Sequence, residues 1–182
     1  MRATGIVRKI DELGRLVLPK EIRRTLHMRE GDPLEIYTDR EGNVILRKYS
    51  PIVEMKTFAQ KYVETLSQIT NHSVLIIDRD KIVASAGGVK KEMIGKSISH
   101  QMGDVIKNRE RVIAVKGDNR YVKITDNGLD EYGSQVIYPI LSDSEIIGAI
   151  VLLGKGSKIS MDETKQELVQ FAVRFLGLLT ES

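Results

Sequence analysis

The fold class is indicated first by residues 4–26, which read TGIVRKIDELGRLVLPKEIRRTL. Two short runs that contain apolar residues, Ile6–Ile10 and Arg15–Leu18, flank the turn-forming residues Asp11–Gly14. This pattern predicts two strands joined by a tight turn. Pro19 then opens a predicted short helix, because a proline at the first helical position has a suitable φ and needs no hydrogen-bonded N–H.

The predicted helix carries a basic face opposite an apolar one. At about 100° per residue, Ile22 and Leu26 fall on one side, where they can pack in a core. The opposite stripe is basic and consists of Lys20, Arg23, Arg24 and His27. The preceding strand and turn add Arg8, Lys9 and Arg15. Arginine suits an anionic partner, because its planar fork binds a phosphate or a guanine edge through two hydrogen bonds.

The charge excess of the chain is confined to the same region. The 182 residues carry a net charge of +3, with 28 Lys and Arg against 25 Asp and Glu. Residues 1–50 hold 11 basic and 8 acidic residues, whereas residues 51–182 hold 17 of each. A basic cluster on an otherwise neutral chain indicates a polyanion-binding surface, and a solvated charged face is the alternative.

The rest of the first fifty residues predicts a β-hairpin. The segment Leu34–Thr38 alternates apolar and polar side chains, Glu41–Gly42 is a turn, and Val44–Tyr49 pairs back. A module of this size with so few large apolar side chains has a poor core of its own, and oligomerisation commonly stabilises such modules. We therefore expect residues 1–50 to fold as a dimer that shares strands between chains.

A second module is predicted from residue 51 onward. Pro51 interrupts the strand pattern, and apolar residues then recur at helical spacing from Met55 to Ile69. The further predicted elements are strands Ser73–Ile77 and Lys81–Ser85, a helix Ser97–Asn108, strands near Arg111–Val115, Arg120–Thr125, Gln135–Ile140 and Ile146–Leu153, and a helix Met161–Leu179. Terminal helices that bracket a mostly antiparallel sheet predict an α+β domain over residues 51–182.

The second module offers weak candidates for a ligand site. Ser85, Gly87 and Gly88 follow a predicted strand, and a loop of small residues lets a ligand approach the backbone closely. A plain turn is the alternative. Aromatic candidates for lining a cavity are Tyr121, Tyr132 and Tyr138. Nothing in the sequence names the ligand.

Enzyme, metal and cofactor signals are missing from the sequence. The chain has 0 Cys, which excludes disulfides, Cys-bound zinc, a thiolate nucleophile and a thioether-linked chromophore. The three histidines, His27, His72 and His100, are far apart in the sequence. Gly95–Ser97 imitates the end of a phosphate-binding loop, but Lys90 stands where that motif needs its first glycine. We therefore expect no catalytic site, no metal and no cofactor.

The sequence also predicts a protein of the cytoplasm. Residues 1–5 lead into charged sequence and not into an apolar signal region. No apolar run approaches the roughly 18 residues that a membrane helix needs. We therefore expect no membrane partner.

Three runs, residues 4–15, 18–26 and 30–35, resemble the swapped-hairpin DNA-binding domain of the AbrB transition-state regulators. With the second module attached, the whole chain resembles the stage V sporulation protein T family of endospore-forming bacteria. The order of helices and strands in residues 51–182 resembles a GAF domain, a fold that senses small molecules. The resemblance thus implies an N-terminal domain over residues 1–50 and a GAF-like domain over residues 51–182.

The resemblance implies a regulator that acts late in sporulation, in the forespore, and activates some genes while repressing others. It implies an interlocked dimer that binds AT-rich, deformable promoter DNA, whose shape can be read without a strict base code. The implied DNA contacts are Arg8, Arg15, Arg23 and Arg24, with Lys9 and Lys20 as supports. His27 stands where a more strongly basic residue is expected.

The GAF-like module is expected to assemble subunits, and a small-molecule effector is left open. If the two terminal helices of this module pair between chains, two dimers form a tetramer. Packing of these helices only within their own chain is the alternative. Two other functions compete: an antitoxin-like protein whose second module binds a protein partner, and an enzymatic C-terminal module.

Overall fold

The chain folds as two compact units, residues 1–49 and residues 50–182. The computed structural model describes residues 4–156 and 163–181. Within these described ranges no helix is long and apolar enough to cross a membrane. The two units are described separately below.

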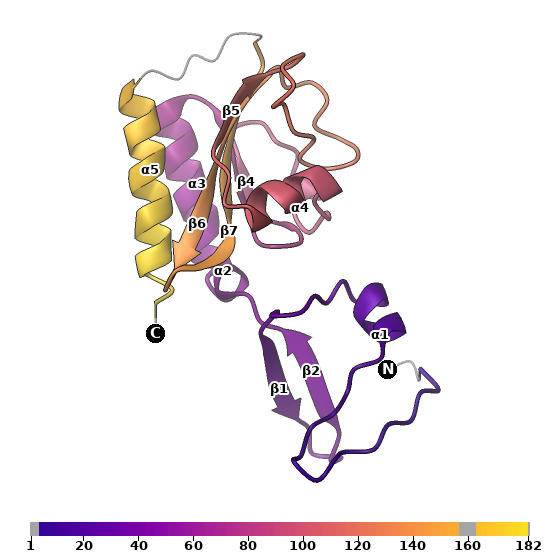
Figure 1. Ribbon diagram of the computed structural model, residues 1–182. Helices are drawn as coiled ribbons and strands as arrows, with labels where there is room; N and C mark the ends of the chain where they lie inside the picture. The colour runs from indigo at the N-terminus through magenta and orange to yellow at the C-terminus, as the bar shows by residue number, and fades with distance from the viewer. Residues whose placement is uncertain (1–3, 157–162, 182) are drawn as a thin grey trace. The chain divides into compact units, whose positions relative to one another are not determined.

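The first unit contains one short helix and one β-hairpin (Figure 1). Helix α1 spans Lys20–Thr25, and the antiparallel strands β1 and β2 span Leu34–Thr38 and Val44–Lys48. The hairpin turn is closed by Asp39, whose carboxylate accepts hydrogen bonds from the backbone N–H groups of Glu41 and Asn43. The hairpin therefore forms as its alternating pattern and its turn residues predict.

The strands predicted at residues 6–10 and 15–18 are wrong for the single chain. Within the described part of this unit, only β1 and β2 are strands. The turn between the two runs is nevertheless formed, since Asp11 N donates to Arg15 O at 3.1 Å and Gly14 N donates to Asp11 O at 2.9 Å. A strand needs neighbours for its backbone N–H and C=O groups, and a single copy does not supply them here.

The second unit is built on a five-stranded antiparallel sheet with the order β4-β3-β7-β6-β5. Its strands are β3 Ser73–Ile77, β4 Ile82–Ala86, β5 Val112–Val115, β6 Ser134–Ser142 and β7 Glu145–Gly154. Its helices are α2 Pro51–Glu54, α3 Lys56–Thr70, a 3-10 turn Lys91–Met93, α4 His100–Lys107 and α5 Glu163–Leu178. The prediction of an α+β domain is confirmed.

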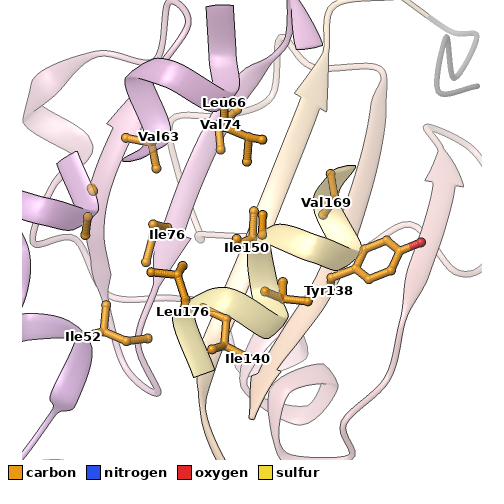
Figure 2. Packing of buried hydrophobic residues seen from close by; sticks show 14 of the residues in the cluster. Ile52, Val63, Leu66, Val74, Ile76, Tyr138, Ile140, Ile150, Val169 and Leu176 are labelled. Atoms are coloured by element: carbon orange, nitrogen blue, oxygen red, sulfur yellow. The ribbon is translucent and has the colours of Figure 1, made fainter. Parts of the chain in front are cut away.

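Each face of this sheet has its own hydrophobic core. Helices α3 and α5 cover one face and α4 lies on the other (Figure 1). Because side chains alternate along a strand, Val74 and Ile76 of β3 face α3 and α5, whereas Leu75 and Ile77 face α4. Figure 2 shows Ile76 and Ile150 in the cluster beneath α3 and α5, together with Leu176 of α5. The sheet is therefore buried on both faces.

One glycine allows α5 to pack closely on the sheet. A Cβ at Gly177 would collide with the carbonyl oxygen of Leu141 on β6. Because the absence of a side chain at Gly177 permits this approach, the neighbouring Val173 and Leu176 are buried against the sheet. We infer a packing role for this glycine.

Several predicted helix limits and one predicted strand differ from the structure. Helix α4 begins at His100, since Ser99 caps it by accepting a hydrogen bond from Met102 N at 3.1 Å. Of the long predicted helix, Met161 lies outside the described residues and α5 ends at Leu178. The strand predicted at residues 120–125 is wrong, because backbone groups of that segment bond to the side chain of Gln135 and to Ser99 and not to the backbone of a neighbouring strand.

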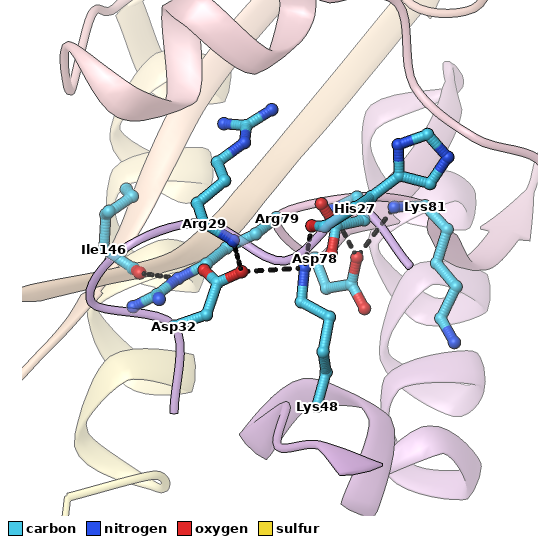
Figure 3. Close-up of polar contacts among 9 residues, drawn as sticks. His27, Arg29, Asp32, Lys48, Asp78, Arg79, Lys81 and Ile146 are labelled. Carbon is cyan, nitrogen blue, oxygen red and sulfur yellow. Dashed lines mark hydrogen bonds and ion pairs between the residues drawn. The ribbon is translucent and has the colours of Figure 1, made fainter. Parts of the chain in front are cut away.

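A buried carboxylate organises the turn between β3 and β4. Asp78 accepts hydrogen bonds from Asp80 N at 2.8 Å and from Lys81 N at 2.7 Å (Figure 3). Burial raises the pKa of Asp78, and the two backbone hydrogen bonds oppose that rise. Arg79 Nε donates to Ile146 O at 2.7 Å, which ties this turn to β7. The turn is therefore fixed from inside the sheet.

Candidate nucleic-acid interface

Helix α1 presents exposed basic side chains. It begins after Pro19, and the acidic Glu21 lies in its first turn, which is favourable for the helix dipole. Lys20, Arg23 and Arg24 are exposed, and their side chains form no hydrogen bond or ion pair with other residues of the described part of the chain. Ile22 is half-buried on the opposite side. The helix thus offers three cations to a partner.

His27 ends this helix and does not extend its basic stripe. Its φ is 51°, in the left-handed region, and Met28 N donates to Arg23 O at 2.7 Å while His27 N donates to Arg24 O at 3.3 Å. These two bonds form a Schellman motif with His27 at the position that usually holds glycine. The prediction that His27 shares the helical face of Arg23 and Arg24 is therefore wrong, because the left-handed residue turns the chain away.

The end of α1 is tied to the hairpin by an ion pair. Lys48 Nζ on β2 donates to His27 O at 2.9 Å and lies 3.0 Å from Asp32 Oδ2 (Figure 3). The same carboxylate oxygen accepts from Arg29 N at 2.7 Å. The Asp32 side chain is 7% exposed, so its charge needs partners such as these. This arrangement holds α1 against β2, and sequence analysis did not find it.

Substitution of His27 by glycine should stabilise the first unit. A side chain in the left-handed region costs about 1 kcal/mol, which glycine does not incur. We expect His27→Gly to raise the melting temperature of the first unit by several degrees, measured by circular dichroism on the full chain. Thr25→Gly inside α1 is the matched control and should lower it, because glycine there weakens the helix. A destabilised H27G would contradict this account of the helix end.

The turn before α1 holds one predicted contact residue in place. Asp11 Oδ2 lies 2.7 Å from Arg15 Nε, and Asp11 Oδ1 accepts from the backbone N–H groups of Leu13 and Arg15 at 3.0 and 2.8 Å. The backbone and side-chain hydrogen bonds from Arg15 lower the pKa of Asp11. The carboxylate is therefore ionised at neutral pH, and its support for the turn is lost as the pH falls through its lowered pKa.

The same turn geometry occurs twice in the first unit. Asp39 and Gly42 form the bonds in the β1–β2 turn that Asp11 and Gly14 form in the earlier one. In both turns, an aspartate stands three residues before a glycine with positive φ. The spacing D-x-x-G in the sequence was the available signal for the Asp11 turn. It follows that residues 6–18 have a hairpin turn already formed.

The remaining predicted contacts lie on the arm before this turn. Arg8 and Lys9 are exposed, and the guanidinium of Arg8 donates only to the neighbouring Val7 O, at 3.5 Å, among the described residues. The structure therefore places Arg8, Lys9 and Arg15 along one turn and its arm, and Lys20, Arg23 and Arg24 on α1. All six are exposed in the first unit.

The small residues proposed for a ligand have packing roles in the second unit. A Cβ at Gly87 would collide with Ser67, His72 and Ser73, and the Ser73 hydroxyl donates to Gly87 O. Ser85 is buried, and its backbone pairs with the side-chain amide of Gln60. Gly88 has only distant neighbours. The loop is therefore packed on the end of α3 at Gly87.

The three tyrosines do not line one cavity. Tyr121 and Tyr132 belong to the core on the α4 face, where Tyr121 Oη donates to Tyr132 O at 2.8 Å. Tyr138 belongs to the core on the opposite face, beneath α3 and α5. The prediction that these side chains share a cavity is wrong, because Tyr138 lies on β6 and faces α3 and α5, whereas Tyr121 and Tyr132 lie in the connection before β6 on the other face of the sheet.

Two family models match the chain. Residues 54–179 match a family described as stage V sporulation protein T C-terminal, transcription factor. Residues 7–54 match a family described as antidote-toxin recognition MazE, bacterial antitoxin. The first match spans most of the second unit, and the second match spans the candidate interface.

Two relatives from Bacillus subtilis (strain 168) are similar to the chain. It is 47% identical to stage V sporulation protein T over 178 residues, which are 97% of this chain and 97% of that protein. It is 63% identical to transition state regulatory protein AbrB over 51 residues, which are 28% of this chain and 52% of AbrB. The resemblance in the first fifty residues is therefore confirmed.

A solved structure defines the fold of the second unit. The GAF domain from Acinetobacter phosphoenolpyruvate-protein phosphotransferase superposes with a TM-score of 0.56 at 16% identity, and covers 73% of this chain and 83% of that one. At this identity the likeness concerns the fold alone, which is GAF-like as predicted. Because the transcription-factor model spans more than half of the chain and a relative is 47% identical over 97% of it, the chain belongs to the stage V sporulation protein T family.

Proposed function

We propose that this protein binds double-stranded DNA and regulates late sporulation genes in the forespore, activating some and repressing others. The observation that carries the proposal is the exposed set of cations on α1 and the Asp11 turn, in a chain of a transcription-factor family. Exposed arginine side chains are suited to contact phosphates and base edges. The proposed site of action is the cytoplasm of the forespore, and we propose no enzymatic activity.

The proposed DNA contacts are the six residues that the sequence indicates. They are Arg8, Lys9, Arg15, Lys20, Arg23 and Arg24. Arg15 is oriented by Asp11 through its Nε, which supports a fixed position for its guanidinium. We propose residues 1–50 as the DNA-binding domain, and AT-rich, deformable promoter DNA as its target.

The test is DNA binding by the full chain at two salt concentrations. Two chains with six cations each should form six or more phosphate contacts, so affinity should fall by about 10³ or more between 50 and 200 mM salt. Fluorescence anisotropy with an AT-rich duplex measures this fall, and a GC-rich duplex of equal length should bind more weakly. An affinity that does not depend on salt would contradict the proposal.

A dimer through the first unit is supported by its exposed apolar side chains. Val7, Ile10 and Val17 are 86, 68 and 74% exposed, and all lie on the two runs beside the Asp11 turn. Val44 and Ile36 on the hairpin are each 67% exposed. Such a dense apolar surface on a small unit indicates a partner surface. We propose that a second copy covers it by pairing strands across the two chains.

A second self-association surface is supported by aromatic side chains on α3 and α5. Phe171 stacks on Phe175 at 6.0 Å, and Phe175 stacks on Tyr62 at 6.1 Å. Phe58 joins this group and Phe171 is 66% exposed. Burial raises the pKa of Tyr62 to about 12, so its hydroxyl stays neutral. We propose that these aromatic residues pair between dimers and that the protein is a tetramer.

Replacing Phe171 by aspartate should convert the tetramer to a dimer. A carboxylate in an apolar contact must be desolvated, so the tetramer should weaken by about 100-fold or more. Sedimentation equilibrium of the full chain measures the change. Gln170→Asp, an equal charge change at an exposed position of α5, is the matched control. If F171D stays tetrameric, the aromatic group does not form the interface.

We propose that residues 51–182 also sense a small molecule. The proposal is supported by the GAF-like fold and by one buried polar atom, since Ser85 Oγ has no hydrogen-bond partner among the described residues. A buried hydroxyl without a partner is unfavourable, and a ligand or water could satisfy it. On this ground Ser85, Gly87 and Gly88 stay candidates for the ligand site. The close packing of Gly87 on α3 argues against a ligand contact at that residue.

An antitoxin-like role is the second candidate, because residues 7–54 match an antitoxin family. In that role the second unit would bind a protein partner. The transcription-factor match over residues 54–179 favours the regulator. Co-purification from sporulating cells separates the two, since an antitoxin should retain a stoichiometric toxin and a regulator should not.

A further inference from the structure

The segment between β5 and β6, residues 116–133, crosses the α4 face of the sheet without forming a helix or a strand. We call it the cover segment. Its side chains Val122 and Ile124 are 9 and 4% exposed and belong to the core on that face. Long connections without secondary structure are uncommon in compact domains and are often functional.

The centre of the cover segment is held by one buried side chain. Gln135 on β6 is 1% exposed, and its amide pairs with both backbone groups of Val122. With the amide assigned so that each of its atoms meets a complementary backbone group, the nitrogen of Gln135 donates to Val122 O at 2.9 Å and its oxygen accepts from Val122 N at 2.5 Å. The glutamine thereby supplies the hydrogen bonds that a neighbouring strand would supply.

The surroundings of Gln135 make this pairing costly to lose. Gln135 lies opposite Ala114 on β5 and Leu153 on β7, and both belong to the core on the α4 face. A buried amide that loses its partners is strongly unfavourable. When Val122 leaves, Gln135 therefore needs another group that presents a donor beside an acceptor.

We propose that Gln135 is the recognition residue of a ligand site that Val122 occupies when no effector is bound. The effector would carry an adjacent N–H and C=O on a small branched apolar body, as a small apolar amino-acid amide or peptide does. It would bind Gln135 through the amide edge, and its apolar body would replace the Val122 side chain. This inference rests on the proposed sensing function of the second unit.

Displacement of Val122 would weaken the cap of helix α4. The residue that caps α4, Ser99, donates its hydroxyl to Lys123 O and its backbone N–H to Ile124 O at 2.9 Å. The carbonyl groups of Lys123 and Ile124 in the cover segment therefore accept hydrogen bonds from the N-cap residue of α4. An effector that lifts Val122 removes support from this cap, so occupancy of the site and the position of α4 are coupled.

The probe that tests the site is N-acetyl-L-valine methylamide, which copies the peptide groups and side chain of Val122. Hydrogen exchange of the full-length Val122→Gly protein is followed by mass spectrometry with and without millimolar probe. Loss of the buried valine side chain should weaken the packing of the cover segment on the sheet by about tenfold or more, so the probe can compete with residue 122 for Gln135. We expect the probe to speed exchange in residues 120–125 by about tenfold, with β6 and β7 unchanged.

Gln135→Met should abolish probe binding, observed by saturation-transfer NMR on the probe methyl groups. Gln60→Met is the matched control, since Gln60 also pairs its amide with a backbone, that of Ser85, and should leave binding unchanged. If the probe does not change hydrogen exchange in V122G, the proposed site is overturned, whether or not Q135M folds. Equal probe binding by Q135M also overturns it.

The proposed sensing function is judged separately, by DNA affinity of the same samples. A probe that opens the cover segment and changes DNA affinity supports both the site and the sensing function. A probe that opens the cover segment without changing DNA affinity supports the site and overturns the sensing function.

Discussion

Replacing Arg23 and Arg24 together by alanine should reduce DNA affinity by at least about 100-fold at moderate salt. The two arginines are exposed neighbours on α1, and their side chains hold no other part of the described chain in place. A dimer loses four charges, and each lost phosphate contact should also lower the salt slope by about 0.9. Fluorescence anisotropy with an AT-rich duplex measures both quantities.

The matched control removes two adjacent cations from the second unit. Lys90 and Lys91 are exposed, and Lys90→Ala with Lys91→Ala changes the net charge by the same amount. We expect the control to bind DNA nearly as well as the parent protein. Circular dichroism should show both variants folded, because none of the four side chains is buried. Equal loss of affinity in the two variants would mean that net charge alone, and not the α1 surface, drives binding.

Replacing Val7 by aspartate should abolish the dimer of the first unit and, with it, DNA binding. Val7 is 86% exposed in the single chain, so within one copy the substitution would cost almost nothing. In the proposed dimer the same side chain is covered by strands of the second copy. An unpaired carboxylate there costs several kcal/mol, which is comparable to the whole stability of a small unit.

The expected result is seen in the concentration dependence of unfolding. The parent first unit should melt at a temperature that rises with protein concentration, as mass action requires, and V7D should lose this transition. Thr4→Asp adds the same charge to the same arm, keeps an acceptor for Ile6 N, and should melt like the parent. If V7D melts normally and binds DNA, the exposed apolar residues are not an interface and the interlocked dimer must be abandoned.

Local patterns explain which parts of the fold were predictable. The strand that the sequence predicts at Ser73–Ile77 has the bounds of β3, since five consecutive apolar or small residues bounded by polar ones indicate a buried strand. The β1–β2 hairpin and the long terminal helices were likewise visible as periodicity. By contrast, residues 120–125 look like a strand in sequence, but their backbone groups bond to Asp118, to Ser99 and to the side chains of Gln101 and Gln135.

The candidate site divides in the same way. The six basic residues could be named from sequence, because charge and the motif around Pro19 are local properties. The roles of His27 and Lys48 could not, since they depend on a left-handed φ and on a contact between residues 21 positions apart. A helical wheel assumes that the helix continues, whereas the Schellman motif at His27 ends it.

The sequence by itself determined the family, the two-module order, the basic character of residues 1–50 and the sheet with its terminal helices. These follow from composition, periodicity and motif, which involve residues near one another in the chain. Only the tertiary structure decided which face of the sheet each tyrosine occupies, that Gly87 and Gly177 are packing glycines, and that Gln135 holds Val122. The reason is that a buried polar group needs a hydrogen-bond partner, and the fold can supply that partner from any part of the chain. The spacing of residues in the sequence does not show which residues become neighbours in this way.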